Sequence, residues 1–520
     1  MDSKLTRRPG GHQGGYVLVA VAALTTVLLA TGIAFMRWST DEATQSVESV
    51  AAMQAYYLAQ MGVVEKGFMY LRSAKETQLP TGDVILPGRQ VMSDEVNQGT
   101  HEGYYEDVHV YGMPAVNQGG DYYLENRRFR VSAVGRVRIH FYENGMSSYK
   151  DISRKAVLYV QIRSFADYMY LTDCDQTRLG ENISFWHGDT LEGRVHSNTY
   201  IAIMQDPQFY DEVSTTAPDF YHGTGYNPGF HGPLPIFNAP AVLVPDTADA
   251  LRIGAAVSGH FVGDDHASTY RIELRGSAAK IWQYPTGTPF DSVNNPSQEV
   301  TIGGRSCWFY ERPVELLGHL HGQLSIGSSY NIFLVDNIWY DCVTLGAHGY
   351  VLPAGFDGSC QDILGIVSEK EVKIANTYAN GRNDSNNRGN TQSRTDSTDI
   401  VIMGAIVALG ESFTFEQQND PDSGYVYQSP PGTPHTDDRG QIFLHGSVTQ
   451  HRRGYVHRSN NGSTGYLKQY KYDLRFRRMK PPCFFHVQDD QGRALFNITQ
   501  WGQANPDVDD THAWKLTRYN

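Results

Sequence analysis

An uncharged apolar run of 21 residues, Tyr16–Met36, is the feature that most constrains how this chain can fold. It reads YVLVAVAALTTVLLATGIAFM. An α-helix of this length is about 31 Å long, which matches the roughly 30 Å hydrocarbon core of a bilayer. The run therefore predicts a membrane-spanning helix close to the N-terminus.

The charges that precede the run predict its orientation. Lys4, Arg7 and Arg8 lie before it, and basic residues favour the cytoplasmic side of a membrane. We therefore expect a single-pass inner-membrane protein with a cytoplasmic N-terminus, whose remaining residues lie in the periplasm, at the cell surface or in an extracellular filament. A cleaved secretory signal is the alternative, but it would have a shorter apolar core, of about 7–15 residues.

The helix is expected to continue beyond the apolar run. Apolar residues recur every seven positions at Val50, Tyr57, Val64 and Leu71. This spacing predicts an amphipathic helix. The predicted helix covers residues 16–78, with its first half in lipid and its second half packed on a globular domain.

Two stretches of this helix carry a family resemblance: GGYVLVAVAALTTVLLATG, in which a basic leader ends at Gly15 and Tyr16 opens an apolar helix, and AAMQAYYLAQMGVVEKGFMYLRS. The first resembles the N-terminus of type IV pilin-like proteins, and the second resembles the helix continuation in minor pilins of the PilX-like group. The resemblance implies that a prepilin peptidase cleaves between Gly15 and Tyr16. It also implies that the helix then leaves inner-membrane lipid and packs beside other pilins or pseudopilins in a filament core.

One position departs from the pattern of that family. Pilins usually carry Glu at the fifth mature position, where it pairs with the N-terminal amine of the next subunit, and here that position is Ala20. A buried charge without a partner is costly. The departure favours a subunit at the tip of a filament, or an anchored protein that does not polymerise.

The composition predicts a mainly β, exported body beyond the helix. Aromatic residues make up 12% of the chain and charged residues only 19%, which is typical of a folded protein. The net charge of −13 argues against a nucleic-acid partner, because such a partner requires a basic face. The predicted parts are a leader (1–15), the helix (16–78), a pilin-like domain (79–180), a larger β-rich domain (181–490) with a disordered loop (376–399), and a C-terminal tail (491–520).

Within the pilin-like domain, residues 127–163 predict a β-hairpin. Arg127–Phe141 and Asp151–Arg163 alternate apolar and polar residues on either side of an Asn144–Gly145 turn signal.

Five stretches of the larger domain share a short pattern, in which a glycine is followed two residues later by a β-branched residue or leucine. The pairs are Gly193–Val195, Gly318–Leu320, Gly365–Val367, Gly404–Ile406 and Gly446–Val448. Repeated corners of this kind are typical of a β-solenoid, whose rungs bury inward-facing aliphatic side chains. We therefore predict an irregular β-solenoid, with a β-sandwich as the alternative.

Several pieces of this domain resemble a family of uncharacterised domains attached to prepilin-type N-termini. They include GRVHSNTYI, LGIVSEKEVKI and GSVTQHRRGYV. The resemblance covers most of residues 165–490. It implies an architecture and a cellular context, but no chemistry.

Residues that could carry chemistry are few. The chain has no hydrolase, metalloprotease or nucleotide-binding motif, so we expect no enzyme, no catalytic residues and no cofactor. Asn419, Asp420 and Asp422 offer oxygen ligands that could hold calcium, but they lack EF-hand spacing and a turn without metal is favoured. Cys342 and Cys360 are the expected disulfide pair, with five unpaired cysteines as the alternative.

An Arg- and Tyr-rich stretch near the C-terminus is the candidate ligand surface. Its leading residues are Arg452, Arg453, Tyr455 and Arg458. Arg and Tyr are favoured at interfaces, so this surface could bind an acidic polysaccharide or a partner protein. The favoured alternative is that the arginines pair with nearby aspartates such as Asp473.

Three functions follow in order of preference. The first is a minor pilin or pseudopilin, a structural or tip subunit of a type IV pilus or type II secretion filament. The second is a membrane-anchored adhesin or glycan-binding protein that does not polymerise. The third is a β-solenoid enzyme that acts on polysaccharide.

Overall fold

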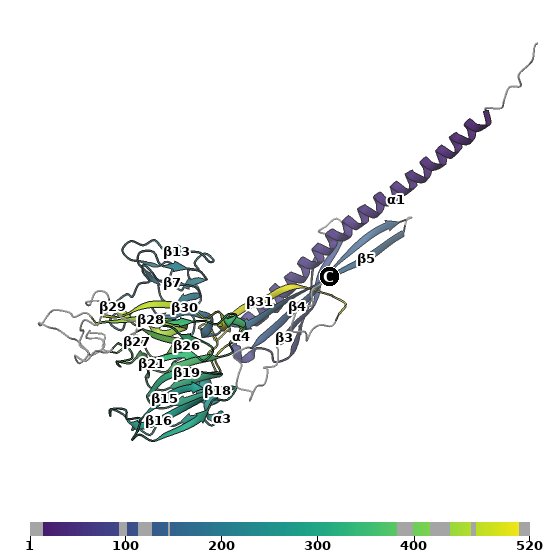
Figure 1. Ribbon diagram of the computed structural model, residues 1–520. Coiled ribbons are helices and arrows are strands. Elements are labelled where there is room, and N and C mark those ends of the chain that lie inside the picture. Colours follow the sequence, from purple (N-terminus) through teal and green to yellow (C-terminus); the bar gives the residue numbers. More distant parts are fainter. Residues whose placement is uncertain are drawn as a thin grey trace, which may run out of the picture.

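A long N-terminal helix and two β-regions make up the computed structural model, which describes residues 14–92, 101–112, 127–143, 146–381, 399–416, 437–458 and 464–508. The chain is mainly β with one long apolar helix, as predicted. Figure 1 shows the helix α1 projecting away from a small sheet, with the larger β-region at the opposite end of that sheet.

The helix is continuous from Gly14 to Ser73. It consists of α1 (Gly14–Met61), a π-helical segment (Gly62–Phe68) and α2 (Met69–Ser73), and it ends before the predicted residue 78. From Val19 onward it is long and apolar enough to cross a membrane, and none of its most apolar window is buried inside the protein. The second half of the helix packs on the sheet.

The predicted packing face of this second half was wrong at three of its four heptad positions and right at Leu71, which is buried. Val50, Tyr57 and Val64 are 53%, 58% and 45% exposed. The buried positions are mostly small residues: Ala51, Ala55, Leu58, Ala59, Gly62 and Val63. The π-helical segment then adds a residue to the turn, which returns the buried face to Gly67 and Leu71.

Small residues face the sheet because the helix approaches it very closely. A Cβ added at Gly135 of the sheet would lie 1.9 Å from the carbonyl oxygen of Ala55. A Cβ at Gly62 would lie 2.8 Å from the Cβ of Ala133. Close packing thus selects alanine and glycine over the bulkier heptad residues.

The sheet under the helix is antiparallel. Its strands are β1 (Asp83–Leu86), β2 (Arg89–Met92), β3 (His101–Gly112), β4 (Arg128–Glu143), β5 (Met146–Ile162) and β31 (Phe496–Ala504). The predicted hairpin is confirmed, because β4 and β5 pair from Arg128↔Gln161 to Glu143↔Met146. The prediction that residues 491–520 form a tail was wrong for β31, which pairs with β5 along the sheet edge.

The larger β-region begins at Tyr168, earlier than the predicted residue 181. Its longest ladder contains β14 (Phe261–Val262), β18 (Arg305–Tyr310), β20 (Gln323–Ser328), β24 (Ile363–Ser368), β26 (Ile400–Ala408), β28 (Asp437–Arg452), β6 (Tyr168–Cys174), β8 (Arg194–Ser197) and β11 (Val213–Thr215), in that spatial order. All these neighbours pair in parallel. β28 pairs with β6 although the two strands are far apart in the sequence, so the first strand of the region lies beside one of its last.

A second parallel ladder runs beside the first. It contains β15 (Ser268–Gly276), β19 (Val314–Leu320), β21 (Ile332–Tyr340), β25 (Val372–Ile374) and β27 (Phe413–Phe415). Buried residues align across it, for example Ile272, Leu316, Leu334, Ile374 and Phe415. The antiparallel sheets of an immunoglobulin-type sandwich have no such ladders.

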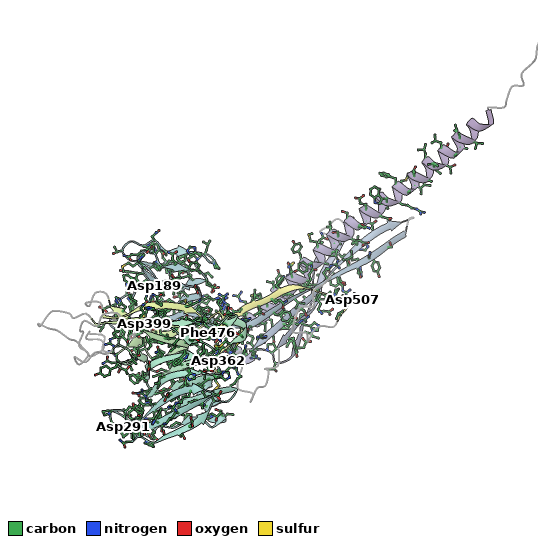
Figure 2. The ribbon with its side chains drawn as sticks, in the orientation of Figure 1. Asp189, Asp291, Asp362, Asp399, Phe476 and Asp507 are labelled. Atoms are coloured by element: carbon green, nitrogen blue, oxygen red, sulfur yellow. A yellow bond between two sulfur atoms is a disulfide. The ribbon has the colours of Figure 1, made fainter. Side chains whose placement is uncertain are left out.

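The remaining elements extend the two ladders. At one end lie α3 (Asp249–Ser258) and the antiparallel strands β16 (Ala278–Pro285) and β17 (Ser297–Thr301). At the other end lie β7 (Thr190–Leu191), β9 (Ala202–Ile203), β10 (Gln208–Phe209), β12 (Tyr221–His222) and β13 (Gly229–Phe230), again in parallel pairs. β30 (Thr464–Tyr472) pairs in parallel with β28 and antiparallel with β29 (His457–Arg458). β22 (Thr344–Leu345) and β23 (Tyr350–Val351) form a small antiparallel pair, and α4 (Phe356–Ser359) follows them in the chain. Figure 2 shows Asp189 and Asp291 toward opposite ends of this region.

The five predicted stretches lie in these ladders with mixed register. The stretches at 404 and 446 are aligned as expected, since Gly404 pairs with Gly446 and Ile406 with Val448. Val195 continues the same column, because Val448 pairs with Tyr170 and Tyr170 with Val195. The stretch at 365 is shifted by one residue, because Gly365 pairs with Ala405. The stretch at 318 lies in the second ladder, where Gly318 pairs with Leu274.

A covering segment, residues 473–487, crosses the outer face of the first ladder. Phe476 is fully buried, and a Cβ at Gly365 would lie 2.9 Å from Pro481. This cover explains why every residue of β24 and β26 is buried, as for strands with both faces covered.

Candidate functional site

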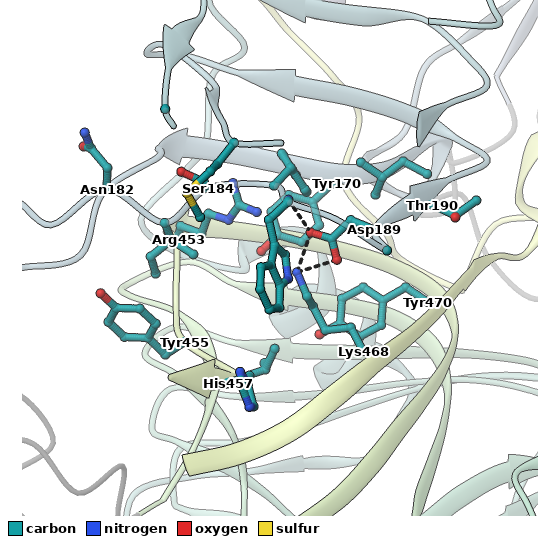
Figure 3. Close-up of a pocket in the computed structure, with 18 of the residues that line it drawn as sticks. Tyr170, Asn182, Ser184, Asp189, Thr190, Arg453, Tyr455, His457, Lys468 and Tyr470 are labelled. Atoms are coloured by element: carbon teal, nitrogen blue, oxygen red, sulfur yellow. Dashed lines mark hydrogen bonds and ion pairs between the residues drawn. The ribbon is translucent and has the colours of Figure 1, made fainter. Parts of the chain in front are cut away.

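A pocket of about 500 Å³ opens between β30, the loop that follows β28 and the strands around β7 (Figure 3). Its lining is mixed, with aromatic side chains such as Trp186, Tyr221 and Tyr455 beside the charged side chains of Asp189, Arg453 and Lys468. The volume falls within the range of pockets for small molecules.

A short turn positions one side of the pocket. Within residues 186–189 the amide of Asp189 donates to the carbonyl of Trp186 at 3.0 Å, and the amide of Trp186 donates to the Asp189 carboxylate at 3.1 Å. Gly188 has φ +88°, which a glycine adopts without strain. The same carboxylate receives the ammonium group of Lys468 at 2.7 Å (Figure 3).

Arg453, which lines the pocket, forms a buried ion pair with Asp175 behind the lining. Arg453 and Asp175 are 2% and 1% exposed and lie 3.2 Å apart. The Arg453 guanidinium also lies 3.7 Å from the ring centroid of Phe185 and 5.1 Å from that of Tyr170. These contacts fix the guanidinium in one place. Burial alone would lower the pKa of Arg453, but the neighbouring carboxylate of Asp175 raises it.

Only part of the predicted ligand surface lies at the surface of the molecule. Arg453 and Tyr455 line the pocket, whereas Arg452 lies against Glu411, 3.9 Å away, and Cys174. Arg458 belongs to β29, and its side chain lies outside the described part of the chain. Arg452, Arg453 and Arg475 pair with acids, as the favoured alternative predicted, and the pair of Arg475 with Asp473 is the most buried.

Asp473 shows how strongly such pairing acts. Burial alone would raise its pKa, but the nearby His445 ring, 3.8 Å away, and the hydrogen bonds from Arg475 lower it to about 2. The carboxylate is therefore ionised at neutral pH and holds the start of the covering segment in place, through a bond to the backbone amide of Arg475 at 3.0 Å.

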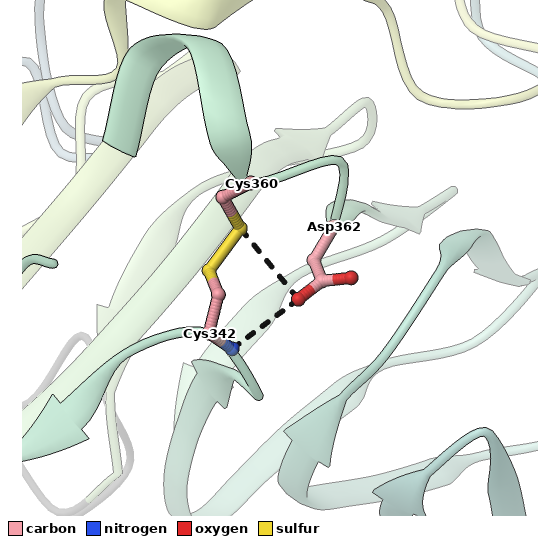
Figure 4. Close-up of side chains that lie close together, drawn as sticks. All are labelled: Cys342, Cys360 and Asp362. Atoms are coloured by element: carbon pink, nitrogen blue, oxygen red, sulfur yellow. Dashed lines mark hydrogen bonds between the residues drawn. A yellow bond between two sulfur atoms is a disulfide. The ribbon is translucent and has the colours of Figure 1, made fainter. Parts of the chain in front are cut away.

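Two disulfides join four of the five cysteines. Cys342 and Cys360 form the predicted pair, and Asp362 lies beside it, accepting from the amide of Cys342 at 3.3 Å (Figure 4). With both sulfurs in the disulfide, this group is a cross-link rather than a set of metal ligands. The alternative of five unpaired cysteines was wrong.

The second disulfide, Cys307–Cys483, was not predicted, and Cys174 keeps a free thiol. The two cysteines are separated by 176 residues, so no local sequence signal pairs them. Only the path of the covering segment brings them together.

Most of the remaining predicted site residues lie at or beyond the edges of the residues that the structure describes. Gly15 and Tyr16 lie in the first turn of α1, and their side chains are outside the described part. Ala20 is exposed on that helix. The calcium candidates Asn419, Asp420 and Asp422 and residues 382–398 of the predicted loop lie outside the described residues.

Comparison with known proteins gives one match. Residues 128–217 match a family described as a domain of unknown function (DUF4900). The match covers the β4–β5 hairpin and the first strands of the larger β-region, up to β11. Neither a curated protein nor a solved structure matches the chain.

Proposed function

We propose that this chain is a membrane-anchored, pilin-like subunit that displays a β-rich body outside the cytoplasm. One observation carries the proposal: from Val19 onward the helix has an apolar window that is not buried at all, and its second half packs on an antiparallel sheet. An exposed half of this composition needs lipid or other helices around it.

The way the helix docks supports a rigid connection between the anchor and the body. Ala55, Gly62 and Gly67 approach β4 so closely that no larger side chain fits at the contact. An ion pair between Lys150 and Glu48, 2.6 Å long, adds a contact further toward the membrane. The sheet would therefore follow the helix as one unit into a filament.

We further infer that the larger region is an irregular β-solenoid. The support is the register of the first ladder, in which one column of buried residues continues through successive parallel strands. The column consists of Trp308, Ile326, Ile366, Ile406, Val448, Tyr170, Val195 and Val213. In-register stacking of this kind is typical of solenoid rungs.

Ala20 favours a place at the tip of a filament over a place in its shaft. Without Glu at this position the subunit lacks the charge that would pair with the amine of a neighbouring subunit. A tip subunit needs one neighbour fewer, and it could carry a bulky body that a shaft could not accommodate.

The first experiment is mass spectrometry of the mature N-terminus of the full-length protein from its native membrane. A chain that begins at Tyr16 is expected. A chain that still begins at Met1 would contradict processing as a pilin and leave an anchored protein.

The second experiment restores the missing charge. Ala20→Glu is expected to incorporate along filaments, as judged by immunogold labelling, whereas the matched control Ala23→Glu places the same charge one helical turn away and is not. Equal labelling of both variants would contradict the tip assignment.

A second candidate function is an anchored surface protein that does not polymerise. It is favoured by Ala20 together with the pocket, since a binding protein needs an anchor and a site but no filament neighbours. A polysaccharide-active enzyme is the third candidate, and turnover of a glycan by the full-length protein would establish it.

A further inference from the structure

We propose that the pocket lined by Trp186, Asp189, Tyr221, Tyr455 and Lys468 binds an uncharged sugar residue. This goes beyond the proposed function, because a filament subunit needs no small-molecule site. The inference depends on the chemistry of the lining and on its fixed geometry.

The lining combines the two kinds of group that a sugar requires. Sugar rings present C–H faces that pack on aromatic side chains, and their hydroxyls need donors and acceptors at set positions. Trp186 and Tyr455 are half-buried and Tyr221 is 47% exposed, so each offers part of a ring to solvent. Asp189 offers carboxylate oxygens and Lys468 an ammonium group at the same wall.

The charges of the pocket cancel, which favours an uncharged ligand. Lys468 is paired with Asp189 at 2.7 Å, and Arg453 with Asp175 at 3.2 Å. An acidic sugar would have to compete with these carboxylates for the two cations. An uncharged hydroxyl can hydrogen-bond to Asp189 or Lys468 without separating them.

The site is organised before any ligand arrives. The turn at 186–189 is held by its own hydrogen bonds (Figure 3), and the hydroxyl of Tyr455 donates to Glu181 at 3.0 Å. Side chains that are already ordered lose little entropy on binding, which lowers the cost of recognising a small polar ligand.

The position of the pocket suits contact with an outside ligand. It lies beside β7 and β30, in the larger β-region and away from the free end of α1 (Figure 1). A protein anchored through α1 would thus present this pocket at a distance from the membrane.

The test uses the full chain in lauryldimethylamine oxide, since sugar-based detergents would compete for the site. Saturation-transfer NMR and calorimetry are run with cellobiose, maltose and N,N′-diacetylchitobiose, and with digalacturonic acid as the acidic probe. At least one uncharged disaccharide is expected to bind, at least tenfold more tightly than digalacturonic acid. Binding of none of the three, or tighter binding of the acid, would overturn the proposal.

Variants then locate the binding. Trp186→Ala and Tyr221→Ala are each expected to weaken binding at least tenfold, and the exposed position of Tyr221 makes its variant safe for folding. Tyr210→Ala is the matched control, because Tyr210 is 50% exposed and stacks on His231 outside the pocket lining. Unchanged affinity in the Tyr221 variant would also overturn the proposal. Neither outcome depends on how the N-terminus is processed.

Discussion

His196 is a buried histidine whose two ring nitrogens both have partners. It is 3% exposed, its Nε2 donates to Asn198 at 3.0 Å, and its Nδ1 accepts from the Ser214 hydroxyl at 2.9 Å. Burial lowers its pKa from 6.5 to about 4. The neutral ring therefore fits this site and the protonated ring does not.

This histidine should make stability depend on pH. Between pH 6.5 and 4 the unfolded chain binds the proton more tightly than the folded chain, so stability falls as the pH is lowered through that window. The loss amounts to about 3 kcal/mol when complete. We expect the melting temperature to drop between pH 7 and 4.5, and to drop less in His196→Gln, whose amide can replace both bonds.

Asp473 acts in a different pH window and serves as the comparison. Its pKa is lowered to about 2, so its contribution is present above pH 3.8 and is lost only as the pH falls from about 4 toward 2. Asp473→Asn should therefore lower the melting temperature at pH 7 and leave the slope between pH 7 and 4.5 unchanged. If the slope changed in this variant, the attribution of the pH dependence to His196 would be wrong.

At the scale of single elements, the helix shows what periodicity predicts and what it misses. The existence of the helix follows from a long apolar and amphipathic pattern, although the helix ends at Ser73 rather than at the predicted residue 78. Its packing face does not, because a close contact with β4 selects Ala55 and Gly62 over the larger Val50 and Tyr57. Summed hydrophobicity gives small residues little weight. The sequence signal for this packing face therefore lay in the spacing of its alanines and glycines.

Gly135 tests that close contact. Its added Cβ would meet the carbonyl oxygen of Ala55 at 1.9 Å and the amide nitrogen of Ala59 at 2.5 Å, and both are backbone atoms that cannot move alone. Gly135→Ala should therefore destabilise the helix–sheet unit by about 1–3 kcal/mol or more. Thermal unfolding and limited proteolysis of residues 50–73 measure this effect.

The matched control for that substitution is Gly82→Ala, since nothing lies within 4 Å of a Cβ at Gly82. It should change the melting temperature by no more than about a degree. Equal effects of the two substitutions would show that the helix does not dock closely at Gly135.

For the molecule as a whole, sequence patterns predicted the class of the fold but not which distant segments pair with one another. The Gly–x–Val stretches indicated repeated strands, and three of the five align in register. Three features depend on contacts between distant residues: the pairing of β28 with β6, the return of β31 to β5, and the covering segment over β24. The pocket depends on the same contacts, since Asp189 and Lys468 come from opposite ends of the larger region's sequence. Arg453 and Tyr455 were found because Arg and Tyr are common at interfaces, whereas Trp186 carried no such signal.

The two disulfides should stabilise the molecule to different extents. Cys307–Cys483 closes a loop of 176 residues and Cys342–Cys360 one of 18. Chain entropy in the unfolded state then gives roughly 5 and 3 kcal/mol. Cys307→Ala with Cys483→Ala should lower the unfolding midpoint more than Cys342→Ala with Cys360→Ala. It should also release the covering segment, which would make residues 473–487 sensitive to protease.

Thiol titration of the unfolded, unreduced protein should find one reactive thiol, that of Cys174. Three or five thiols would contradict one or both disulfides, and a larger loss from the shorter loop would contradict the chain-entropy argument.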